Sequence, residues 1–451
     1  MKEQVFDVIV LGSGTAGQVV SYECLEKKLS VVVVDNRPFG GTCTLRGCDP
    51  KKVLVGAGEA VDWIQRMEDF GVSSKDVRIN WKRLMEVKKS FVEHVPERVE
   101  KGLQDAGAKT FHGTATIIDD KNVSVNGQVI SGKHLVIATG ASPMKLGISG
   151  EEHVTISDDF LELTTLPKKI VFLGGGYISF EFAHLTARAG ADVIILQRSE
   201  HLLSGFDPDL VGILVKASKA LGIAIRTNAP VVGIDKKDSS LFVHTKGTDG
   251  KEETVSADLV VHGGGRVPNV FDLRLEKANV QYTKKGVVVN DYLQSVSNPH
   301  VFAAGDASEY GLPLTPVAGK EGLVVAHNIL HREKKKAKYS EMPSVVFTVP
   351  PLASVGMRED EAEKKGLDFD IKFLDTSGWF SSRRIHEKHS GVKTLVEKKT
   401  GRILGAHLLG HNAEELINIF ALAIAKNIPA EDLRNIIYSY PTHSSDIQYM
   451  V

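Results

Sequence analysis

Cysteine is scarce in this chain, which has three cysteines among its 451 residues. So few cysteines exclude a secreted scaffold held together by disulfides and favour a reducing compartment, so we expect a cytoplasmic protein. Long hydrophobic runs are also missing, because no apolar stretch approaches the roughly 20 residues that span a bilayer. Residues 1–4 lead directly into the apolar run Val5–Leu11 without a cleavage site, and we expect no signal peptide.

An excess of either charge is missing as well. Lys and Arg together number 55, Asp and Glu number 56, and the formal net charge is −1 with both signs interspersed. This balance gives no electrostatic reason to expect a nucleic acid or a membrane surface as a partner. We interpret the basic run Lys334–Lys336 as a solvated linker.

The chain contains two similar strand–turn–helix–strand units. Apolar runs at Val8–Leu11 and Val31–Val34 flank a helical segment, and the same pattern returns at residues 168–197. Such continuous apolar runs are typical of strands buried in a parallel sheet. Residues 51–106 are predicted to be largely helical, and the block from about residue 338 onward mixes strands with an apolar helix. We therefore predict an α/β fold with two Rossmann-like dinucleotide-binding domains and a C-terminal α+β domain.

The first unit carries a glycine motif between its strand and its helix, Gly12-x-Gly14-x-x-Gly17. Its glycines permit the turn, let a pyrophosphate approach the backbone, and let the helix pack on the strand. The helix N-terminus supplies amide donors for phosphates. Asp35 ends the next strand, where it can accept a hydrogen bond from a ribose hydroxyl. This combination predicts a dinucleotide site.

The second unit carries Gly174-x-Gly176-x-x-Ser179, in which serine replaces the third glycine but is still small enough for packing. An NAD site normally places an acid at the end of the following strand, and a 2′-phosphate needs a cation there. Gln197 and Arg198 stand at that point. This pattern favours NADP(H) over NAD(H), although Arg198 could also be an ordinary exposed arginine.

The most specific signal is the pair Cys43 and Cys48. Five residues of regular helix rise about 7.5 Å, more than the Cα separation of about 4.4–6.8 Å that a disulfide tolerates. Gly47 and Pro50 are residue types that allow a helix to be distorted so that the sulfurs can meet. A bridge closed against helix geometry should be easily reduced, and a helix N-terminus near Cys43 would favour its thiolate. We therefore predict a catalytic disulfide.

Two other interpretations of the cysteines are inert thiols and half of a zinc site. No third or fourth ligand lies near Cys43 and Cys48 in the sequence, so we expect no bound metal. Cys24 lies in the first predicted Rossmann helix, where an inert buried thiol is expected.

With these motifs in this order, the chain resembles the class I pyridine nucleotide–disulfide oxidoreductases, such as glutathione reductase, dihydrolipoyl dehydrogenase and mercuric reductase. The resemblance covers nearly the whole chain and implies an FAD-dependent homodimer whose active site is shared between subunits. It implies a discontinuous FAD-binding domain at 1–147 and 270–335, an NAD(P)-binding domain at 148–269, and a dimerisation domain at 336–451.

The resemblance also implies roles for residues that match the family's motifs. Cys48 matches the thiol beside the flavin, and Cys43 matches the outer thiol that attacks substrate. Lys52 and Glu181 match an ion pair at the flavin N5, and Tyr177 matches the aromatic residue that covers the flavin. The implied FAD contacts are Gly12, Ser13, Gly14, Gly17, Asp35, Thr42, Lys52, Ala115, Thr139, Gly140, Asp306 and Thr315. The implied NAD(P) contacts are Gly174, Gly176, Tyr177, Ile178, Arg198, Gly265 and Arg266.

The C-terminal tail departs from the family. In the glutathione and lipoamide enzymes the partner's tail supplies the histidine of an HPTxxE motif, whereas here Tyr440 and Ser445 stand at the histidine and glutamate positions. A tyrosine can donate a proton but is a poor base near neutral pH. Either His443 and Asp446 have taken over the proton relay, or His443 is an exposed turn residue, and both interpretations stay open.

Other departures concern the substrate. The tail lacks the cysteine pair that mercuric reductases need, and Leu323 replaces an arginine that binds glutathione in some relatives. The segment Arg383–His389 is either an anion-binding loop or a solvated one.

We predict a reductase of a small disulfide or related sulfur electrophile, and a dihydrolipoyl dehydrogenase-type activity is the nearest variant. The alternatives are an NAD(P)H-dependent quinone or metal-ion reductase and a non-catalytic redox-sensing binding protein.

Overall fold

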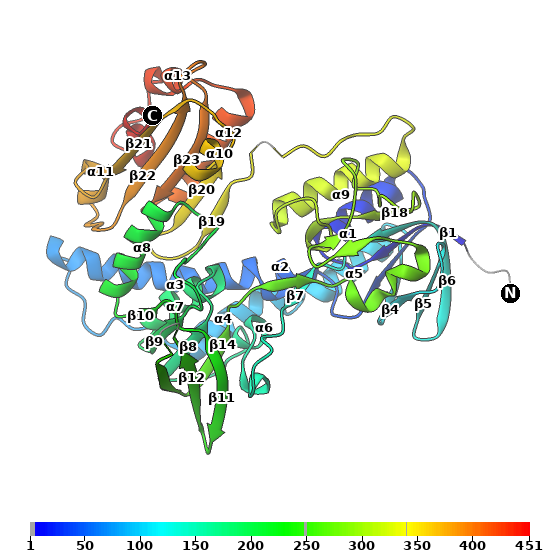
Figure 1. Cartoon of the computed structure of the whole chain (residues 1–451), viewed down its shortest axis with the longest axis horizontal. Helices are drawn as coiled ribbons and strands as arrows, with labels where there is room; N and C mark the ends of the chain where they lie inside the picture. The colour runs from blue at the N-terminus through cyan, green and yellow to red at the C-terminus, as the bar shows by residue number, and fades with distance from the viewer. Residues whose placement is uncertain (1–4, 248–249, 340) are drawn as a thin grey trace. The chain divides into compact units, whose positions relative to one another are not determined.

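The computed structural model describes residues 5–247, 250–339 and 341–451, and Figure 1 labels its elements. The chain forms two compact units. The first comprises Met1–Lys51, Val87–Met144 and Arg266–Tyr339, and the second comprises Lys52–Glu86, Lys145–Gly265 and Ser340–Val451. The mixed α/β class predicted from the sequence is confirmed, while the predicted domain boundaries stay predictions.

A seven-stranded sheet forms the centre of the first unit. Its strands are β1 (Val5–Leu11), β2 (Val31–Asp35), β3 (Lys109–His112), β4 (Ala115–Ile117), β5 (Asn122–Val125), β6 (Gln128–Ile137) and β18 (Val301–Ala303). β1 pairs in parallel with β2 and with β6, and β18 also lies parallel to β6. The apolar runs predicted at Val8–Leu11 and Val31–Val34 are these buried strands. The turn between β5 and β6 has both Asn126 and Gly127 at positive φ, as a tight hairpin requires.

Helices cover this sheet and place the residues of the site. α1 (Thr15–Glu26) packs against α9 (Thr315–Leu330), and both lie beside the sheet in Figure 1. The predicted helical region 51–106 contains three helices, α3 (Cys48–Met67), α4 (Trp81–Val92) and α5 (Val95–Asp105), and its residues 52–86 belong to the second unit. The shorter elements of the first unit are α2 (Gly41–Arg46), β7 (Ala141–Pro143), β15 (Arg266–Pro268), β16 (Tyr282–Thr283) and β17 (Gly286–Val287).

The second unit contains a four-stranded parallel sheet and a separate antiparallel sheet. The parallel strands, in spatial order, are β10 (Ala224–Arg226), β9 (Asp192–Leu196), β8 (Lys169–Leu173) and β14 (Leu259–His262). The antiparallel strands are β11 (Val231–Lys237), β12 (Ser240–Lys246) and β13 (Glu252–Ala257). The helices here are α6 (Ser157–Phe160), α7 (Tyr177–Arg188) and α8 (Pro208–Ala220). The second strand–turn–helix–strand repeat is therefore β8, α7 and β9.

The C-terminal part of the second unit is the predicted mixture of strands and helices. Its five strands, in spatial order, are β19 (Ser344–Val346), β20 (Leu352–Gly356), β23 (Ile403–Leu409), β22 (Gly391–Glu397) and β21 (Phe369–Asp375). Its helices are α10 (Glu359–Lys364), α11 (Phe380–Arg383), α12 (Ala413–Lys426), α13 (Ala430–Asn435) and α14 (Ile447–Met450). Among the described residues, no helix combines the length and hydrophobicity that crossing a bilayer demands.

Candidate functional site

The first glycine motif forms a tight turn between β1 and α1. Gly12 has φ +106°, and a Cβ added there would lie 2.2 Å from the carbonyl oxygen of Ala138. The Asp35 carboxylate accepts hydrogen bonds from the amide and the hydroxyl of Ser13, at 2.8 and 2.6 Å. α1 begins after Gly14, and no side chain among the described residues caps it there. The backbone amides at the start of α1 can therefore bind a ligand, and the turn fits the pyrophosphate of a dinucleotide such as FAD.

Apart from Lys52, which belongs to the second unit, the remaining residues predicted to contact FAD lie in the same unit. Thr139 and Asn269 exchange hydrogen bonds, at 2.8 and 3.0 Å, where β7 pairs with β15. Burial raises the pKa of Asp306, and the nearby Arg266 guanidinium opposes that shift. Arg266, predicted as an NAD(P) contact, also donates to the carbonyl of Ala141. The structure therefore groups Arg266 with the residues expected around FAD. Ala115, another of these residues, begins β4.

The helix that carries the two predicted catalytic cysteines is interrupted between them. α2 ends at Arg46, Gly47 leaves helical geometry with φ −139° and ψ −117°, and α3 begins at Cys48. A Cβ at Gly47 would lie 2.9 Å from the carbonyl oxygen of Thr42, so glycine allows this close approach. The distortion predicted at Gly47 is present. Pro50 instead lies in the first turn of α3, where its missing N–H breaks no helical hydrogen bond.

The two thiols share a proton unequally. Both cysteines are free thiols. The hydrogen bond with Cys43 lowers the pKa of Cys48 to about 6, and Thr315 and Lys51 act in the same direction while burial opposes them. The same hydrogen bond, together with burial, raises the pKa of Cys43. This hydrogen bond favours the thiolate of Cys48, and the expectation that a helix N-terminus favours the thiolate of Cys43 stays a prediction.

The N-terminus of α9 lies beside this thiolate. Thr315 is the first residue of α9, and its hydroxyl oxygen lies 3.6 Å from the Cys48 sulfur. No side chain among the described residues caps α9 at Leu314. A free helix N-terminus stabilises negative charge close to it. Thr315, predicted to contact FAD, is thus also a neighbour of the reactive sulfur.

The second glycine motif, in the second unit, repeats the first with different polar groups. The side-chain oxygen of Gln197 accepts from the Gly175 amide at 3.0 Å, as Asp35 does from Ser13. The Gln197 amide group donates to the Ser199 hydroxyl and the His201 carbonyl, at 2.8 and 2.9 Å. α7 has no side-chain cap among the described residues at Gly176, so the amides at its start can face a phosphate.

Serine fits where the third glycine usually stands. Ser179 is fully buried, and a Cβ added at Gly263 would lie 2.0 Å from its hydroxyl oxygen. Arg198, the cation predicted to select NADP(H), is exposed at the end of β9. Tyr177 and Ile178 begin α7, and Tyr177 is 50% exposed.

Phe347 brings together the two residues predicted to form the ion pair at the flavin N5. Its amide donates to the buried carboxylate of Glu181 at 2.8 Å, and the Lys52 ammonium lies 4.9 Å from the centroid of its ring. The Lys52 ammonium also forms an ion pair of 2.8 Å with Glu59, about two turns further along α3. The Lys52–Glu181 ion pair stays a prediction. Phe347 has no sequence motif and was missed.

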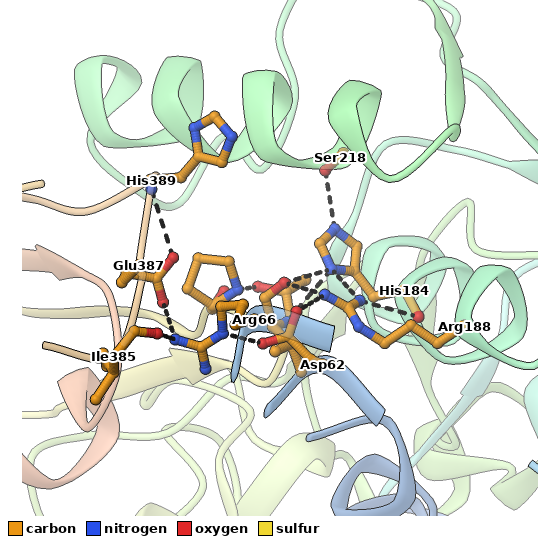
Figure 2. Close-up of polar contacts among 11 residues, drawn as sticks. Asp62, Arg66, His184, Arg188, Ser218, Ile385, Glu387 and His389 are labelled. Atoms are coloured by element: carbon orange, nitrogen blue, oxygen red, sulfur yellow. Dashed lines mark hydrogen bonds and ion pairs between the residues drawn. The ribbon is translucent and has the colours of Figure 1, made fainter. Parts of the chain in front are cut away.

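A buried polar network, which the sequence did not reveal, fixes α3 against α7 in the second unit. Figure 2 shows Asp62 between two guanidinium groups. Its oxygens accept from Arg66 at 2.7 Å and from Arg188 at 2.8 Å, and the Arg188 side chain is only 4% exposed. His184 Nε2 lies 2.9 Å from the Ser218 hydroxyl oxygen. Burial lowers the pKa of His184 to about 3. His184 is therefore a neutral structural histidine.

The same network holds the segment Arg383–His389. Arg66 donates to the Ile385 carbonyl at 2.9 Å and lies 3.7 Å from the Glu387 carboxylate. Ile385 and Glu387 are buried, and burial raises the pKa of Glu387 to about 7. Arg383, Arg384 and Lys388 are exposed. The segment is thus a pinned loop that presents cations, not a freely solvated one.

Asp62 is therefore expected to matter for stability. Replacing Asp62 by alanine leaves Arg188 with an uncompensated buried charge, which should lower the free energy of unfolding by about 3 kcal/mol. The measurement is denaturant unfolding. Asp105→Ala is the matched control, because the Lys101–Asp105 pair is exposed, and it should cost less than about 0.5 kcal/mol. Equal losses in both variants would contradict the role of the network.

The C-terminal tail gives each predicted residue a different neighbour. Tyr440 is 78% exposed. Burial lowers the pKa of His443 to about 4, and its ring lies 5.3 Å from that of His411. The Asp446 carboxylate instead has a hydrogen bond with Ser381, and burial raises its pKa. No relay between His443 and Asp446 is visible among these contacts, so the relay stays a prediction.

His443 is connected to α3 through the ring of His411. The ring of His411, its neighbour, lies 5.3 Å from that of Trp63 on α3. Trp63 follows Lys52 by eleven residues of continuous helix, which corresponds to about 17 Å.

Comparison with known proteins gives a consistent result. The family described as pyridine nucleotide-disulphide oxidoreductase matches residues 6–322, and its dimerisation domain matches residues 342–451. A mercuric reductase of Staphylococcus aureus is 32% identical over 98% of this chain and 81% of its own length. A dihydrolipoyl dehydrogenase of Bacillus subtilis is 31% identical over 97% of this chain and 93% of its own. The Cu(II) complex of the HOCl-induced flavoprotein disulfide reductase RclA from Escherichia coli is 25% identical, with a TM-score of 0.88 and 99% of each chain covered.

Proposed function

The chain belongs to the pyridine nucleotide-disulphide oxidoreductase family of flavoenzymes, and we propose that it reduces a small disulfide or related sulfur electrophile through Cys43 and Cys48. The observation that carries this proposal is the polarised thiol pair. The Cys48 sulfur lies 3.6 Å from the Thr315 hydroxyl at the α9 N-terminus, and the hydrogen bond between the two thiols lowers the pKa of Cys48 and raises that of Cys43. A structural cysteine pair needs no such division.

The two thiols can transfer the proton that the reaction needs between themselves. Cys43 attacks one sulfur of the acceptor while its proton passes along the existing hydrogen bond to Cys48. The other sulfur of the acceptor leaves as a thiolate and takes that proton from Cys48. Cys48, again a thiolate, then attacks Cys43, closes the Cys43–Cys48 bond and releases the second thiolate, which takes a proton from solvent. This sequence fits a tail in which tyrosine replaces the usual histidine.

FAD, when bound, would take a hydride from the reduced nicotinamide and pass the electron pair to the Cys43–Cys48 disulfide. In the first unit, the turn at Gly12 and Gly14 would hold its pyrophosphate. In the second unit, the turn at Gly174 and Gly176 would hold the nicotinamide nucleotide.

We propose NADPH as the preferred donor. Gln197 and Arg198 follow the end of β9, so this point offers no carboxylate for a ribose 2′-hydroxyl. The polar atoms of Gln197 are already engaged with Gly175, Ser199 and His201. Exposed Arg198 is the adjacent cation, which suits a 2′-phosphate.

We also propose a homodimer in which the tail of one subunit reaches the site of the other. The matched dimerisation domain supports this assembly. The segment before the tail exposes apolar side chains that a partner would cover, since Ile437 is 97% exposed and Ile436 is 48% exposed.

A metal ion is a second candidate acceptor. The supporting observation is the similarity to RclA, which is described in complex with Cu(II). In the part of the chain that the structure describes, no group of three or more His, Cys, Asp and Glu side chains could hold a metal. Any metal ion would therefore have to meet the thiol pair itself, as a substrate.

An anaerobic titration tests the proposed function. We expect a yellow protein whose flavin is reduced by NADPH at lower concentrations than by NADH, because Arg198 can pair with the 2′-phosphate. A small disulfide added next should reoxidise the protein and yield two thiols per NADPH consumed. A colourless protein, or a reduced protein that no disulfide reoxidises, would contradict the proposal; reoxidation by Cu(II) alone would favour the second candidate.

A further inference from the structure

A groove of about 770 Å³ lies along the second half of α9, in the first unit. One wall comes from α9 and the other from the segment that follows it. The groove is lined by Tyr292, Lys320, Leu323, Val324, Lys334, Lys335, Lys336, Ala337, Lys338 and Tyr339. Five of these described residues are lysines and none is acidic. Its volume is in the range of pockets that hold small molecules.

The lysine-bearing segment is held in place. The buried side chain of Asn328 donates to the Lys335 carbonyl at 2.9 Å and accepts from the Lys335 amide at 2.7 Å. The Ala337 amide donates to the Asp291 carbonyl at 2.8 Å, and Ala337 is buried. The Lys334–Lys336 run is exposed, as the sequence predicted, but it is not a loose linker.

A second anchor lies at the end of the segment. The Tyr339 hydroxyl donates to the carboxylate of Glu321 at 2.6 Å, and Glu321 is a buried residue of α9. The segment is therefore fixed to α9 at both ends. Ala337 is buried, whereas Lys336 and Lys338 on either side of it are exposed.

The lysines have different neighbours. Lys334 donates to carbonyl groups at the C-terminal end of α9, including that of His331 at 3.1 Å. Lys336 pairs with Asp291 at 2.8 Å and lies 5.7 Å from the centroid of the Tyr292 ring. Lys335 and Lys338 are exposed. Such a concentration of like charge is unfavourable by itself, and an anion would relieve it.

The floor of the groove is apolar and aromatic. Leu323 is 47% exposed although it belongs to a helix that is otherwise well packed. Tyr292 and Tyr339 contribute rings to the same groove. A ligand that matches this lining needs several negative charges and a flat or apolar part.

We propose that this groove binds a phosphorylated small molecule of nucleotide size, with its phosphates on Lys335 and Lys338 and its flat part over Leu323 and the tyrosines. This site is separate from the two glycine motifs. A site for a long polyanion would not need the apolar floor, and a plain linker would need neither the anchors nor the lysines.

Calorimetric titration of the FAD-loaded protein, with NADP⁺ present to fill the nicotinamide site, tests this proposal. The probes are ATP, inorganic tripolyphosphate and adenosine. We expect ATP to bind most tightly, tripolyphosphate more weakly and adenosine least, with ATP affinity falling as salt is added. Lys335→Glu with Lys338→Glu should weaken ATP binding at least about tenfold, or about 1.4 kcal/mol.

A matched control separates the groove from general charge. Lys284→Glu with Lys285→Glu makes the same change of net charge at exposed lysines of the same unit, and ATP affinity should change less than about twofold. Equal loss in both double variants would overturn the proposal, as would undetectable ATP binding by the unmodified protein. Binding of heparin but not of ATP would overturn the assignment of a small molecule. Catalytic turnover is not measured, so failure here leaves the proposed function standing.

Discussion

Cys43→Ser is expected to lower turnover with disulfide acceptors at least about a thousandfold while the protein stays yellow. Serine at this position still donates a hydrogen bond to Cys48, but its oxygen cannot form the mixed disulfide with the acceptor. The groups expected to hold FAD, such as the turn at Gly12 and Gly14, are untouched. The measurement is NADPH oxidation in the presence of a panel of disulfides, together with the visible absorbance of the flavin.

The choice of acceptor decides between the proposed function and its alternatives. A quinone reductase that uses only the flavin would keep its activity in Cys43→Ser. A redox-sensing protein would show little NADPH oxidation with any acceptor, even before substitution. Retained disulfide reduction in Cys43→Ser would refute the assigned role of Cys43.

Cys24→Ser is the matched control for this substitution. Cys24 is fully buried in α1, and burial raises the pKa of its thiol to about 12. It therefore cannot supply a thiolate near neutral pH, and its replacement should leave the turnover of folded protein unchanged. The structure confirms the buried thiol that the sequence predicted at this position.

Local signals in the sequence were enough to predict the two nucleotide turns. The glycine spacing and the apolar runs on either side are encoded within about 30 residues, and these segments fold as β1–α1–β2 and β8–α7–β9. The helix distortion at Gly47 could also be predicted, because a glycine between two closely spaced cysteines allows the backbone to approach itself closely. Such features depend on neighbours in the chain, so sequence reasoning reaches them.

Contacts between distant segments were not predictable in the same way. Asp62 and Arg188 lie 126 residues apart, and neither belongs to a motif. The carboxylate of Glu181 and the amide of Phe347 are separated by 166 residues. The lysine run at 334–336 was interpreted as a linker because no sequence motif indicates the hydrogen bonds that Asn328 and Asp291 make with this segment. Only the folded chain shows these partners.

The polarity of the thiol pair shows the same limit. Both cysteines lie in the first turns of helices, Cys43 in α2 and Cys48 in α3, so helix position alone could not rank them. The structure adds Thr315, which comes from α9 and is 267 residues away from Cys48. It also adds the hydrogen bond between the two thiols, which lowers the pKa of Cys48 and raises that of Cys43. Together these contacts favour the thiolate of Cys48.

The thiolate of Cys48 is therefore expected to titrate near pH 6 in the reduced protein. Its pKa lies below the ordinary value for a thiol, so the thiolate is present above about pH 6 and is lost as the pH falls through that value. A thiolate close to a flavin gives a long-wavelength absorbance band. That band should decline with the same midpoint, and disulfide reduction should decline with it.

Substitutions around Cys48 should move this midpoint in a fixed order. Cys43→Ala removes the hydrogen bond that lowers the pKa most and should shift the midpoint upward furthest. Cys43→Ser keeps a donor and should shift it less, which makes the two variants a matched pair. Thr315→Val removes a second favourable contact and should also raise the midpoint. A midpoint that stays near pH 6 in Cys43→Ala would show that the charge on Cys48 has another origin, and the proton transfer proposed between the two thiols would then lose its basis.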